Sequence, residues 1–447
     1  MKIAVVGAGW AGLAAAVRLH QDGCDVRIYE AAAQPGGRAR RVRHPALGID
    51  TDNGQHLLLG AYRDTLDLMR SLGVDPGQAC DIRPLALESA DRRLRLAFWP
   101  LPAPAHHLGI LCASRGLEGW RGRFHLWRTF RALEPDRIDP GLDAATWLRR
   151  LGCPPGLLGR LWAPLCLAAT NTPLERTEAA LLARVLRDSL GAGAAASRFV
   201  IPRAGLDELW PRQARDLLGK RLRRQRVLRI AARPGGGWEV DGEPCDRVIL
   251  ATPPGEARRL LAPLPGAASW LDAWPDWRHA AIGTLSLRLE HPWESGHAMA
   301  LLRDDPARDA WGQWLFDRSA TASAADERLL AHVVIGRADR YAGRDAAAVA
   351  AGVLAQVAAQ VRTPLPPVEA WALITEKRAT FDVTPGLRRP GPATPWAGLL
   401  LAGDWTDTGY PAVLEGAVRS GLRAAALASA PVAGRGPGVG PAPADQR

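Results

Sequence analysis

A glycine-spaced turn at the start of the chain constrains its fold more than any other feature. Residues 2–6 (KIAVV) form a short apolar run that predicts a buried strand, and Gly7-x-Gly9-x-x-Gly12 follows directly. Residues 13–20 then read as a helix and residues 25–30 as a second strand. Strand, glycine turn, helix and strand in this order predict one βαβ unit, whose crossover is right-handed.

The spacing of these residues indicates a dinucleotide site. Gly7 permits a tight turn, Gly9 lets the backbone beside Ala8 approach a pyrophosphate, and Gly12 lets the helix close on the strand. The anion is then stabilised by the free N–H groups at the helix N-terminus. Glu30 ends the second strand, where its carboxylate can accept hydrogen bonds from ribose hydroxyls and disfavour a 2′-phosphate.

A second glycine pair extends this site. Residues 34–38 read QPGGR, so Gly36 and Gly37 let the chain pass close to the pyrophosphate, and Arg38 can offer a charge-assisted fork to a phosphate. The arrangement resembles the extended FAD signature of the amine oxidase and phytoene desaturase superfamily. The resemblance implies that the dinucleotide is FAD.

The segment from residue 400 to residue 421 resembles the closing flavin motif of the same superfamily. It contains Gly403-Asp404 and, further on, Val413-Leu414 before a predicted helix. The resemblance implies that Asp404 bonds a ribityl hydroxyl and that the backbone of Val413 and Leu414 lies beside the isoalloxazine. A helix N-terminus there would stabilise the negative charge that gathers on the ring upon reduction.

Three further matches to the superfamily are shorter. Residues 52–56 (DNGQH) occupy the place of a second glycine loop, which implies that Gly54 and Gln55 pass the reactive edge of the flavin. Val227 lies where a strand residue contacts adenine through its backbone, although simple strand packing explains it nearly as well. Residues 246–253 resemble the strand that runs under the cofactor.

Within the superfamily, residues 52–62, residues 165–172 and the closing motif resemble the squalene-associated FAD-dependent desaturases, and more narrowly the hydroxysqualene dehydroxylases of bacterial hopanoid synthesis. The resemblance implies that reduced FAD delivers hydride to an allylic carbon of hydroxysqualene while the hydroxyl leaves as water, which yields squalene. Val413 stands where amine oxidases carry an aromatic residue, and an aliphatic wall suits a hydrocarbon better than a cationic amine.

This chemistry needs a proton donor near the departing hydroxyl. His56 is the leading candidate because it falls beside the expected flavin edge and an imidazole titrates near neutral pH. Asp52 would be its partner or its substitute. A structural role for His56, or a backbone contact to the flavin, is the simpler interpretation.

Two other functions fit the same motifs. A carotenoid or phytoene-type desaturase would use the flavin to accept hydride instead of donating it. A non-catalytic prenyl-lipid-binding protein would share the fold without flavin, but the intact set of glycines, Glu30, Arg38 and Asp404 argues against that alternative. Only one dinucleotide fingerprint is evident, so the sequence does not identify the electron donor.

The distribution of strand-like segments predicts an α/β protein with a discontinuous Rossmann-like FAD-binding domain and an inserted α+β substrate-binding domain. Residues 1–75, 200–255 and 370–430 are assigned to the FAD-binding domain, and residues 76–199 and 256–369 to the substrate-binding domain. Residues 431–447 are rich in glycine and proline and predict a disordered tail.

The formal charge is +11, carried by arginine almost throughout, since Lys2, Lys220 and Lys377 are the only lysines. No nucleic-acid-binding motif accompanies this charge, so contact with an anionic membrane surface explains it better. The six cysteines show no metal-ligand spacing, and no signal peptide or spanning segment is evident. We therefore expect no metal and a cytoplasmic protein, with peripheral contact to the inner face of the membrane as an option.

Trp120, Phe124, Trp127 and Arg131 recur at helical spacing. Such a helix can lie in a bilayer interface and take up a membrane-dissolved substrate, or its aromatic residues can pack inside the substrate-binding domain. Interior packing is the simpler expectation. Trp270, Trp274 and Trp277 present the same two alternatives.

Overall fold

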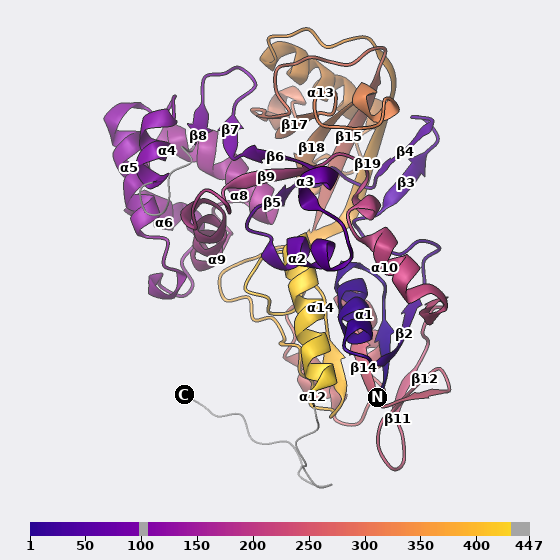
Figure 1. Ribbon diagram of the computed structural model, residues 1–447. Coiled ribbons are helices and arrows are strands. Elements are labelled where there is room, and N and C mark those ends of the chain that lie inside the picture. The colour runs from indigo at the N-terminus through magenta and orange to yellow at the C-terminus, as the bar shows by residue number, and fades with distance from the viewer. Residues whose placement is uncertain (98–105, 431–447) are drawn as a thin grey trace.

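The structure is a computed structural model that describes residues 1–97 and 106–430. The predicted tail, residues 431–447, lies outside the described residues. Figure 1 shows three parts: a parallel sheet with helices α1 and α14 at the lower right, a larger antiparallel sheet at the top, and a group of helices at the left.

The parallel sheet collects strands from widely separated stretches of the chain, in the order β10-β2-β1-β14-β20. Val6 of the central strand lies beside Tyr29 on one side and Leu250 on the other. Its strands are β1 (Lys2–Val6), β2 (Asp25–Glu30), β10 (Leu222–Arg224), β14 (Arg247–Leu250) and β20 (Leu399–Leu401). β1 and β14 are buried almost throughout, which is why they read as unbroken apolar runs. The predicted α/β class is confirmed.

Helices α1 (Trp10–Gln21) and α14 (Leu414–Ser429) pack against each other beside this sheet (Figure 1). Their backbones are in close contact, because a Cβ atom added to Gly421 would lie 2.1 Å from the carbonyl oxygen of Ala11. The first and last helices of the described chain are thereby joined. Helix α2 (Arg63–Ser71), helix α3 (Pro76–Ala79) and helix α10 (Pro211–Leu218) lie nearby.

A small three-stranded sheet follows β10, formed by β11 (Ile230–Ala232), β12 (Trp238–Val240) and β13 (Glu243–Cys245). Strands β10 and β11 belong to different sheets, so strand pairing is interrupted between Arg224 and Ile230. The carboxylate of Asp241 explains the interruption, because it accepts hydrogen bonds from the backbone N–H groups of Leu228 and Arg229 at 3.0 and 2.8 Å.

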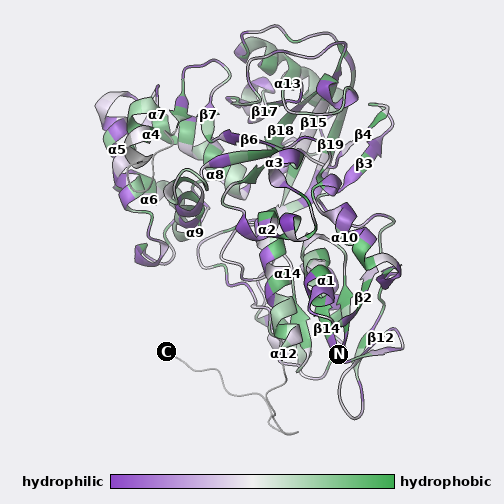
Figure 2. Cartoon of the chain, in the orientation of Figure 1, coloured by the Kyte–Doolittle hydropathy of each residue, from purple (hydrophilic) through white to green (hydrophobic). Residues whose placement is uncertain are grey.

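The second large sheet is antiparallel, in the order β16-β17-β18-β15-β19. Helix α13 (Ala346–Gln360) packs at this end of the molecule. The strands are β15 (His279–Leu289), β16 (Met299–Leu301), β17 (Trp314–Asp317), β18 (Leu330–Gly336) and β19 (Val368–Phe381). Figure 2 shows that these strands are largely hydrophobic, whereas the hairpin of β3 (Arg41–His44) and β4 (Ile49–Asp52) is hydrophilic.

The sheets show where individual stretches lie relative to the expected domain division. Residues 370–381, expected in the FAD-binding part, belong to β19 and so to the antiparallel sheet. Strand β9 (Arg198–Pro202) pairs with β5 (Leu58–Leu59) and β6 (Cys80–Pro84) in a small sheet of their own. A strand carries no local mark of the sheet that it joins, so the sheet membership of these stretches could not be predicted from the sequence.

The remaining elements are mostly helical and cover the left side of Figure 1. The short strands β7 (Ala86–Glu88) and β8 (Arg95–Ala97) form a hairpin. The helices here are α4 (His106–Ala113), α5 (Gly119–Arg131), α6 (Ala144–Arg150), α7 (Pro155–Leu157), α8 (Ala163–Thr170) and α9 (Ala179–Leu186), with π-helical turns over Leu158–Trp162 and Arg187–Gly191. Helices α11 (Pro254–Leu261) and α12 (Ala267–Asp272) follow β14.

Helix α5 corrects the expectation that its aromatic residues pack inside. The side of the helix that packs inside carries His125, Leu126 and Phe130. Trp120, Phe124 and Trp127 are instead 72%, 51% and 41% exposed. The helical spacing marked one face correctly, but spacing alone does not show whether that face meets the core or the solvent.

Trp270, Trp274 and Trp277 follow the interior alternative. The ring of Trp274 lies 5.1 Å from that of Trp405, and the ring of Trp277 lies 5.1 Å from that of Phe381. These residues belong to the apolar core beneath β14 and β20. In the part of the chain that the structure describes, no helix has both the length and the apolar character needed to cross a bilayer.

Candidate functional site

One large cavity of about 1630 Å³ lies between the carboxyl ends of the parallel strands and the antiparallel sheet. Ligand pockets for small molecules usually hold about 300–1,000 Å³. The cavity is therefore large enough for a dinucleotide together with a second, extended molecule. One end is lined by glycine loops and charged side chains, and the other by apolar side chains.

The turn from β1 to α1 forms the floor of the glycine-lined end. Gly7 has a φ of +102°, and a Cβ atom there would lie 2.6 Å from the carbonyl oxygen of Ala251. A Cβ atom on Gly12 would lie 1.8 Å from the carbonyl oxygen of Gly7. Both glycines are thus required for α1 to start directly at the end of the strand.

Gly9 has a different role, because its backbone is unstrained. A Cβ atom on Gly9 would meet only the Cα atom of Gly37, at 3.9 Å. The amide of Gly36 donates to the carbonyl of Ala8 at 2.8 Å, which ties the two glycine loops together. Gly9 caps α1 without any side-chain hydrogen bond to the first turn, so the helix start faces the cavity with free N–H groups. This cradle fits a pyrophosphate.

Glu30 lies at the cavity wall next to this cradle. One carboxylate oxygen accepts from the backbone N–H of Ala8 at 2.7 Å, and the other from Ala32 at 2.8 Å. These bonds fix the carboxylate at the end of β2, where a ribose would lie. Val227 lines the same end, after β10 and not within a strand, and its carbonyl accepts from Arg259 at 2.7 Å.

The C-terminal motif forms the opposite wall of the same cavity. Gly403, Asp404, Val413 and Leu414 all line it, although they lie about 400 residues from the first glycines in the chain. Helix α14 starts after Val413, and no side chain caps its first turn. The cavity thus has two uncapped helix N-termini, one at each glycine-bearing wall, and both favour negative charge. These residues fit the pyrophosphate and the flavin of an FAD molecule.

Arg38 joins the two walls. Its guanidinium donates to the carboxylate of Asp404 at 2.7 Å and to the carbonyl of Ala379 at 2.7 Å. The carboxylate is buried, and its charge raises the pKa of Arg38 above the usual value. Arg38 and Asp404 were expected to hold different parts of the cofactor. The structure adds that the two side chains form a salt bridge, so Arg38 compensates the negative charge of Asp404.

The loop after β4 brings Gly54, Gln55 and His56 to the middle of the cavity. A Cβ atom on Gly54 would lie 3.6 Å from the hydroxyl oxygen of Thr284, so the loop runs along β15. Burial, with a smaller contribution from the positive charge of Arg38, lowers the pKa of His56 to about 4. The imidazole is therefore neutral at pH 7, with one ring nitrogen to donate and one to accept a hydrogen bond.

Asp52, the expected partner of His56, lies behind this loop. Its carboxylate accepts from the backbone N–H of Leu206 at 3.0 Å. Burial raises the pKa of Asp52 to about 7. Asp52 lines a second, much smaller chamber of about 20 Å³, and His56 lines both this chamber and the large cavity. The two residues are thus neighbours across the chamber.

The apolar end of the cavity was not predicted residue by residue. Its lining comes from helices and strands of the helical group and the antiparallel sheet, so no local pattern marks it. Leucine, methionine and aromatic side chains dominate, among them Leu57, Leu85, Leu165, Phe199, Met299, Trp314 and Phe316. Tyr62 and Tyr410 add phenol groups near the start of α14.

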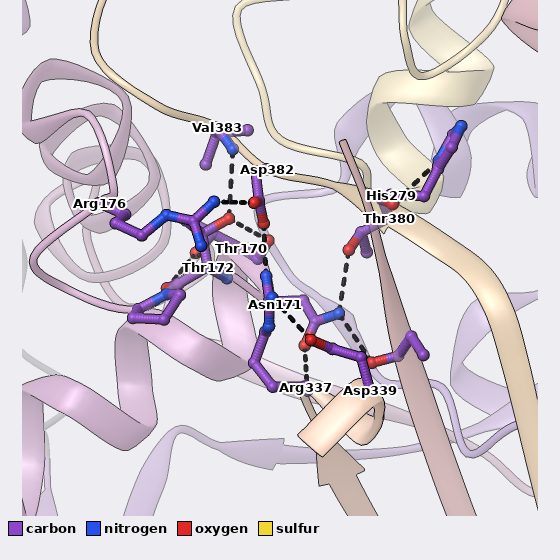
Figure 3. A network of polar contacts seen from close by, with 12 residues as sticks. Thr170, Asn171, Thr172, Arg176, His279, Arg337, Asp339, Thr380, Asp382 and Val383 are labelled. Carbon is purple, nitrogen blue, oxygen red and sulfur yellow. Dashed lines mark hydrogen bonds and ion pairs between the residues drawn. The ribbon is translucent and has the colours of Figure 1, made fainter. Parts of the chain in front are cut away.

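A buried polar network supports the wall between the two ends (Figure 3). Asn171 has a φ of +51°, and its amide donates to the hydroxyl of Thr380 at 3.0 Å and accepts from the backbone of Arg337 at 2.8 Å. Asp382 accepts from Arg337 at 2.6 Å and from Arg176. The network ties the loop after α8 to the ends of β18 and β19. The network gives the motif at residues 165–172 a structural role, because Asn171 and Thr172 hold the loop after α8 against the ends of β18 and β19 at the cavity wall.

Comparison with known proteins agrees with this geometry. The family model of flavin-containing amine oxidoreductases matches residues 10–428. The hydroxysqualene dehydroxylase of Rhodopseudomonas palustris is 32% identical over 445 residues, which cover 95% of this chain and 97% of the relative. The probable zeta-carotene desaturase of Synechococcus elongatus is 26% identical over 495 residues, which cover 95% of this chain and 98% of the relative. The structure of cyclohexylamine oxidase from Brevibacterium oxydans superimposes with a TM-score of 0.66 at 18% identity, covering 96% of this chain and 98% of the oxidase.

Proposed function

Because this chain belongs to the family of flavin-containing amine oxidoreductases, we propose that it is an FAD enzyme that reduces hydroxysqualene to squalene, a step of hopanoid and squalene synthesis. The observation that carries the proposal is one continuous cavity in which a dinucleotide cradle opens onto an apolar chamber. The similarity to the hydroxysqualene dehydroxylase over 95% of the chain supports the choice of substrate.

The proposed reaction replaces a hydroxyl by a hydrogen. Reduced flavin, when bound, supplies the hydride; a proton joins the departing hydroxyl to form water. The chain binds the cofactor through the glycine loops, Glu30, Arg38 and Asp404. The apolar end holds the prenyl arms and keeps water away from the allylic cation. His56 lies where the two ends meet and delivers the proton, with Asp52 behind it.

Two alternatives use the same site. The similarity to a zeta-carotene desaturase favours hydride transfer in the opposite direction, from hydrocarbon to oxidised flavin. It is the weaker alternative, because that relative is 26% identical and the dehydroxylase 32%. A prenyl-lipid carrier without flavin would have no use for the Gly9–Gly37 cradle or for two uncapped helices facing one cavity.

Anaerobic single-turnover reaction with three isoprenoid compounds separates these functions. Photoreduced protein and, in a separate arm, oxidised protein are mixed with hydroxysqualene, squalene or phytoene, while flavin absorbance and product mass are followed. We expect reoxidation with hydroxysqualene alone and a product that has lost its oxygen. Reduction of oxidised flavin by phytoene would establish the desaturase instead, and a colourless protein that takes up no FAD would leave only the carrier.

We further propose that the protein contacts the inner face of the cytoplasmic membrane through helix α5. A substrate of this kind dissolves in lipid, so the enzyme has to meet a bilayer. Trp120 and Trp127 are exposed, and the guanidiniums of Arg121 and Arg131 lie 5.9 and 5.4 Å from their ring centres. Tryptophan beside arginine suits the interface of an anionic membrane. The expectation of a cytoplasmic protein is part of this proposal.

Sedimentation with vesicles tests the membrane contact. On vesicles that contain phosphatidylglycerol, the double variant Trp120→Asp/Trp127→Asp is expected to bind about tenfold more weakly or worse, because two aromatic anchors are lost and two negative charges added. Leu427→Asp is the control, since Leu427 is 45% exposed on α14, a different helix. Equal pelleting of the double variant and the wild type at low salt would dismiss the role of α5.

A further inference from the structure

A small polar chamber lies behind His56, between the hairpin β3–β4 and the antiparallel sheet. Its volume is about 20 Å³, and a cavity of at least about 10–15 Å³ holds one water molecule. A buried water needs two to four polar partners, and the lining supplies more than enough. The polar side chains of the lining are Arg41, Asp50, Thr51, Asp52, Gln55, His56, Arg318, Glu327 and His332.

The chamber lies between the large cavity and the exterior. Gln55 and His56 belong to the lining of both spaces, so the chain between the chamber and the large cavity is formed by these two residues. At the other end, Asp50 lines the chamber with a side chain that is 49% exposed. The chamber lining thus extends from a half-exposed side chain, Asp50, to His56 and does not include the apolar end of the large cavity.

Asp52 is the carboxylate inside the chamber that can change its charge near neutral pH. The groups that face it are the N–H of Leu206, the cations of Arg41 and Arg318, and the carboxylate of Asp207. Both cations are shared with another carboxylate, because Glu327 accepts from Arg41 at 2.6 Å and from Arg318 at 3.2 Å. They compensate the charge of Asp52 only in part, and burial raises its pKa to about 7.

His332 completes the wall opposite the hairpin. Its Nδ1 atom lies 2.9 Å from the hydroxyl oxygen of Ser286, and burial lowers its pKa to about 3. His332 is therefore neutral at pH 7 and does not add a positive charge to the chamber. His56 is neutral as well, so it can accept a proton at one ring nitrogen and release another from the second.

We propose that this chamber is a proton inlet, in which a water molecule between Asp52 and His332 passes protons from the exterior to His56. The inference rests on the proposed function, in which every turnover consumes one proton. In the step, the carboxylic acid of Asp52 gives its proton to the water, and the water gives one to the imidazole. The imidazole releases its other proton to the hydroxyl that leaves as water, and Asp52 regains a proton from the solvent past Asp50. Asp52 thus acts through His56 and does not touch the substrate.

The test compares Asp52→Asn with wild type over pH 5.5–9 in the single-turnover reaction, a range of roughly two pH units to either side of the pKa. In the wild type, the rate of hydroxysqualene reduction should fall above pH 7 as Asp52 loses its proton. Asp52→Asn keeps an acceptor for the Leu206 amide but has no acidic proton. We therefore expect its rate to be lower than that of the wild type by about tenfold or more, with no further decrease of the rate near pH 7. Asp52→Glu should restore the fall in part.

Asp81→Asn is the matched control, because Asp81 lies on neighbouring strand β6 and lines neither the cavity nor the chamber among the described residues. It should keep the wild-type rate and profile. Ala204→Val, which narrows the chamber without changing a charge, should slow the reaction and keep the flavin bound. A wild-type profile in Asp52→Asn, or an equal loss in Asp81→Asn, would overturn the inlet.

A second readout is independent of turnover. The ring signals of His56 in the NMR spectrum, assigned with His56→Gln, should shift near pH 7 in the wild type as Asp52 ionises across the water. The shift should vanish in Asp52→Asn. A shift that persists in the variant, or a wild type without one, would overturn the inlet even if hydroxysqualene proved not to be the substrate. If the shift behaves as expected while hydroxysqualene stays unreacted, the proposed substrate fails and the inlet stands.

Discussion

Gly9→Leu is expected to give a folded but colourless protein. The backbone at Gly9 has a φ of −70°, which any residue adopts, and a new Cβ atom would meet only Gly37 at 3.9 Å. The leucine side chain would then fill the space between the two glycine loops, where the pyrophosphate is expected. Loss of two charge-assisted hydrogen bonds costs about 3–6 kcal/mol, so FAD should bind at least about a hundredfold more weakly.

Flavin absorbance after dialysis and titration with FAD measure this loss, and circular dichroism checks the fold. Gly159→Leu serves as the control, because nothing lies within 4 Å of its Cβ position and it lines neither chamber. Gly12→Val is expected to fail earlier, in folding, because its Cβ atom would overlap the carbonyl of Gly7. Wild-type affinity for FAD in Gly9→Leu would show that the cradle does not hold the pyrophosphate.

Asp382→Ala should lower the free energy of unfolding by about 3–5 kcal/mol. The Asp382 side chain is 5% exposed and accepts from two arginines, of which Arg337 is itself 15% exposed (Figure 3). Its removal leaves the mostly buried guanidinium of Arg337 with only the more exposed carboxylate of Asp339 as a partner. The same network holds Asn171 and Thr380 at the cavity wall, so the variant should also bind substrate less well.

Urea unfolding followed by tryptophan fluorescence measures this change. The matched control is Asp339→Ala, which removes the other carboxylate bound to Arg337 at 2.8 Å. The Asp339 side chain is 42% exposed, so its loss should cost less than about 1 kcal/mol. Equal costs for the two variants would mean that burial does not decide the strength of this network.

The nucleotide-binding end could be predicted from the sequence because its signals are local. Gly7, Gly9 and Gly12 stand at fixed offsets within a single turn, and Asp404 lies within a short motif. Each such motif specifies its own geometry, whatever the rest of the chain does. The expectation that chain segments near residues 10 and 410 share one site followed from these motifs, and both line the same cavity.

Long-range contacts could not be read in this way. The bond between Arg38 and Asp404 spans 366 residues, and the sequence showed only that each residue suits a cofactor. Asp52 and His56 are four residues apart and both line the small chamber, yet only His56 also lines the large cavity, because Asp52 ends β4 and its carboxylate accepts from Leu206. The prediction that the aromatic face of α5 is buried was wrong for a related reason. A helical repeat of aromatic residues has the same spacing in the sequence whether that face contacts the core or the solvent.

The order of the parallel sheet has a consequence for synthesis of the protein. Strand β1 lies between β2 and β14, and α1 packs on α14, the last described helix. A ribosome adds about 5–20 residues per second, so β1 waits on the order of tens of seconds before β14 emerges. During that time its apolar edge has no partner on one side. The parallel sheet and the cavity at its edge can therefore be completed only after translation has nearly reached α14.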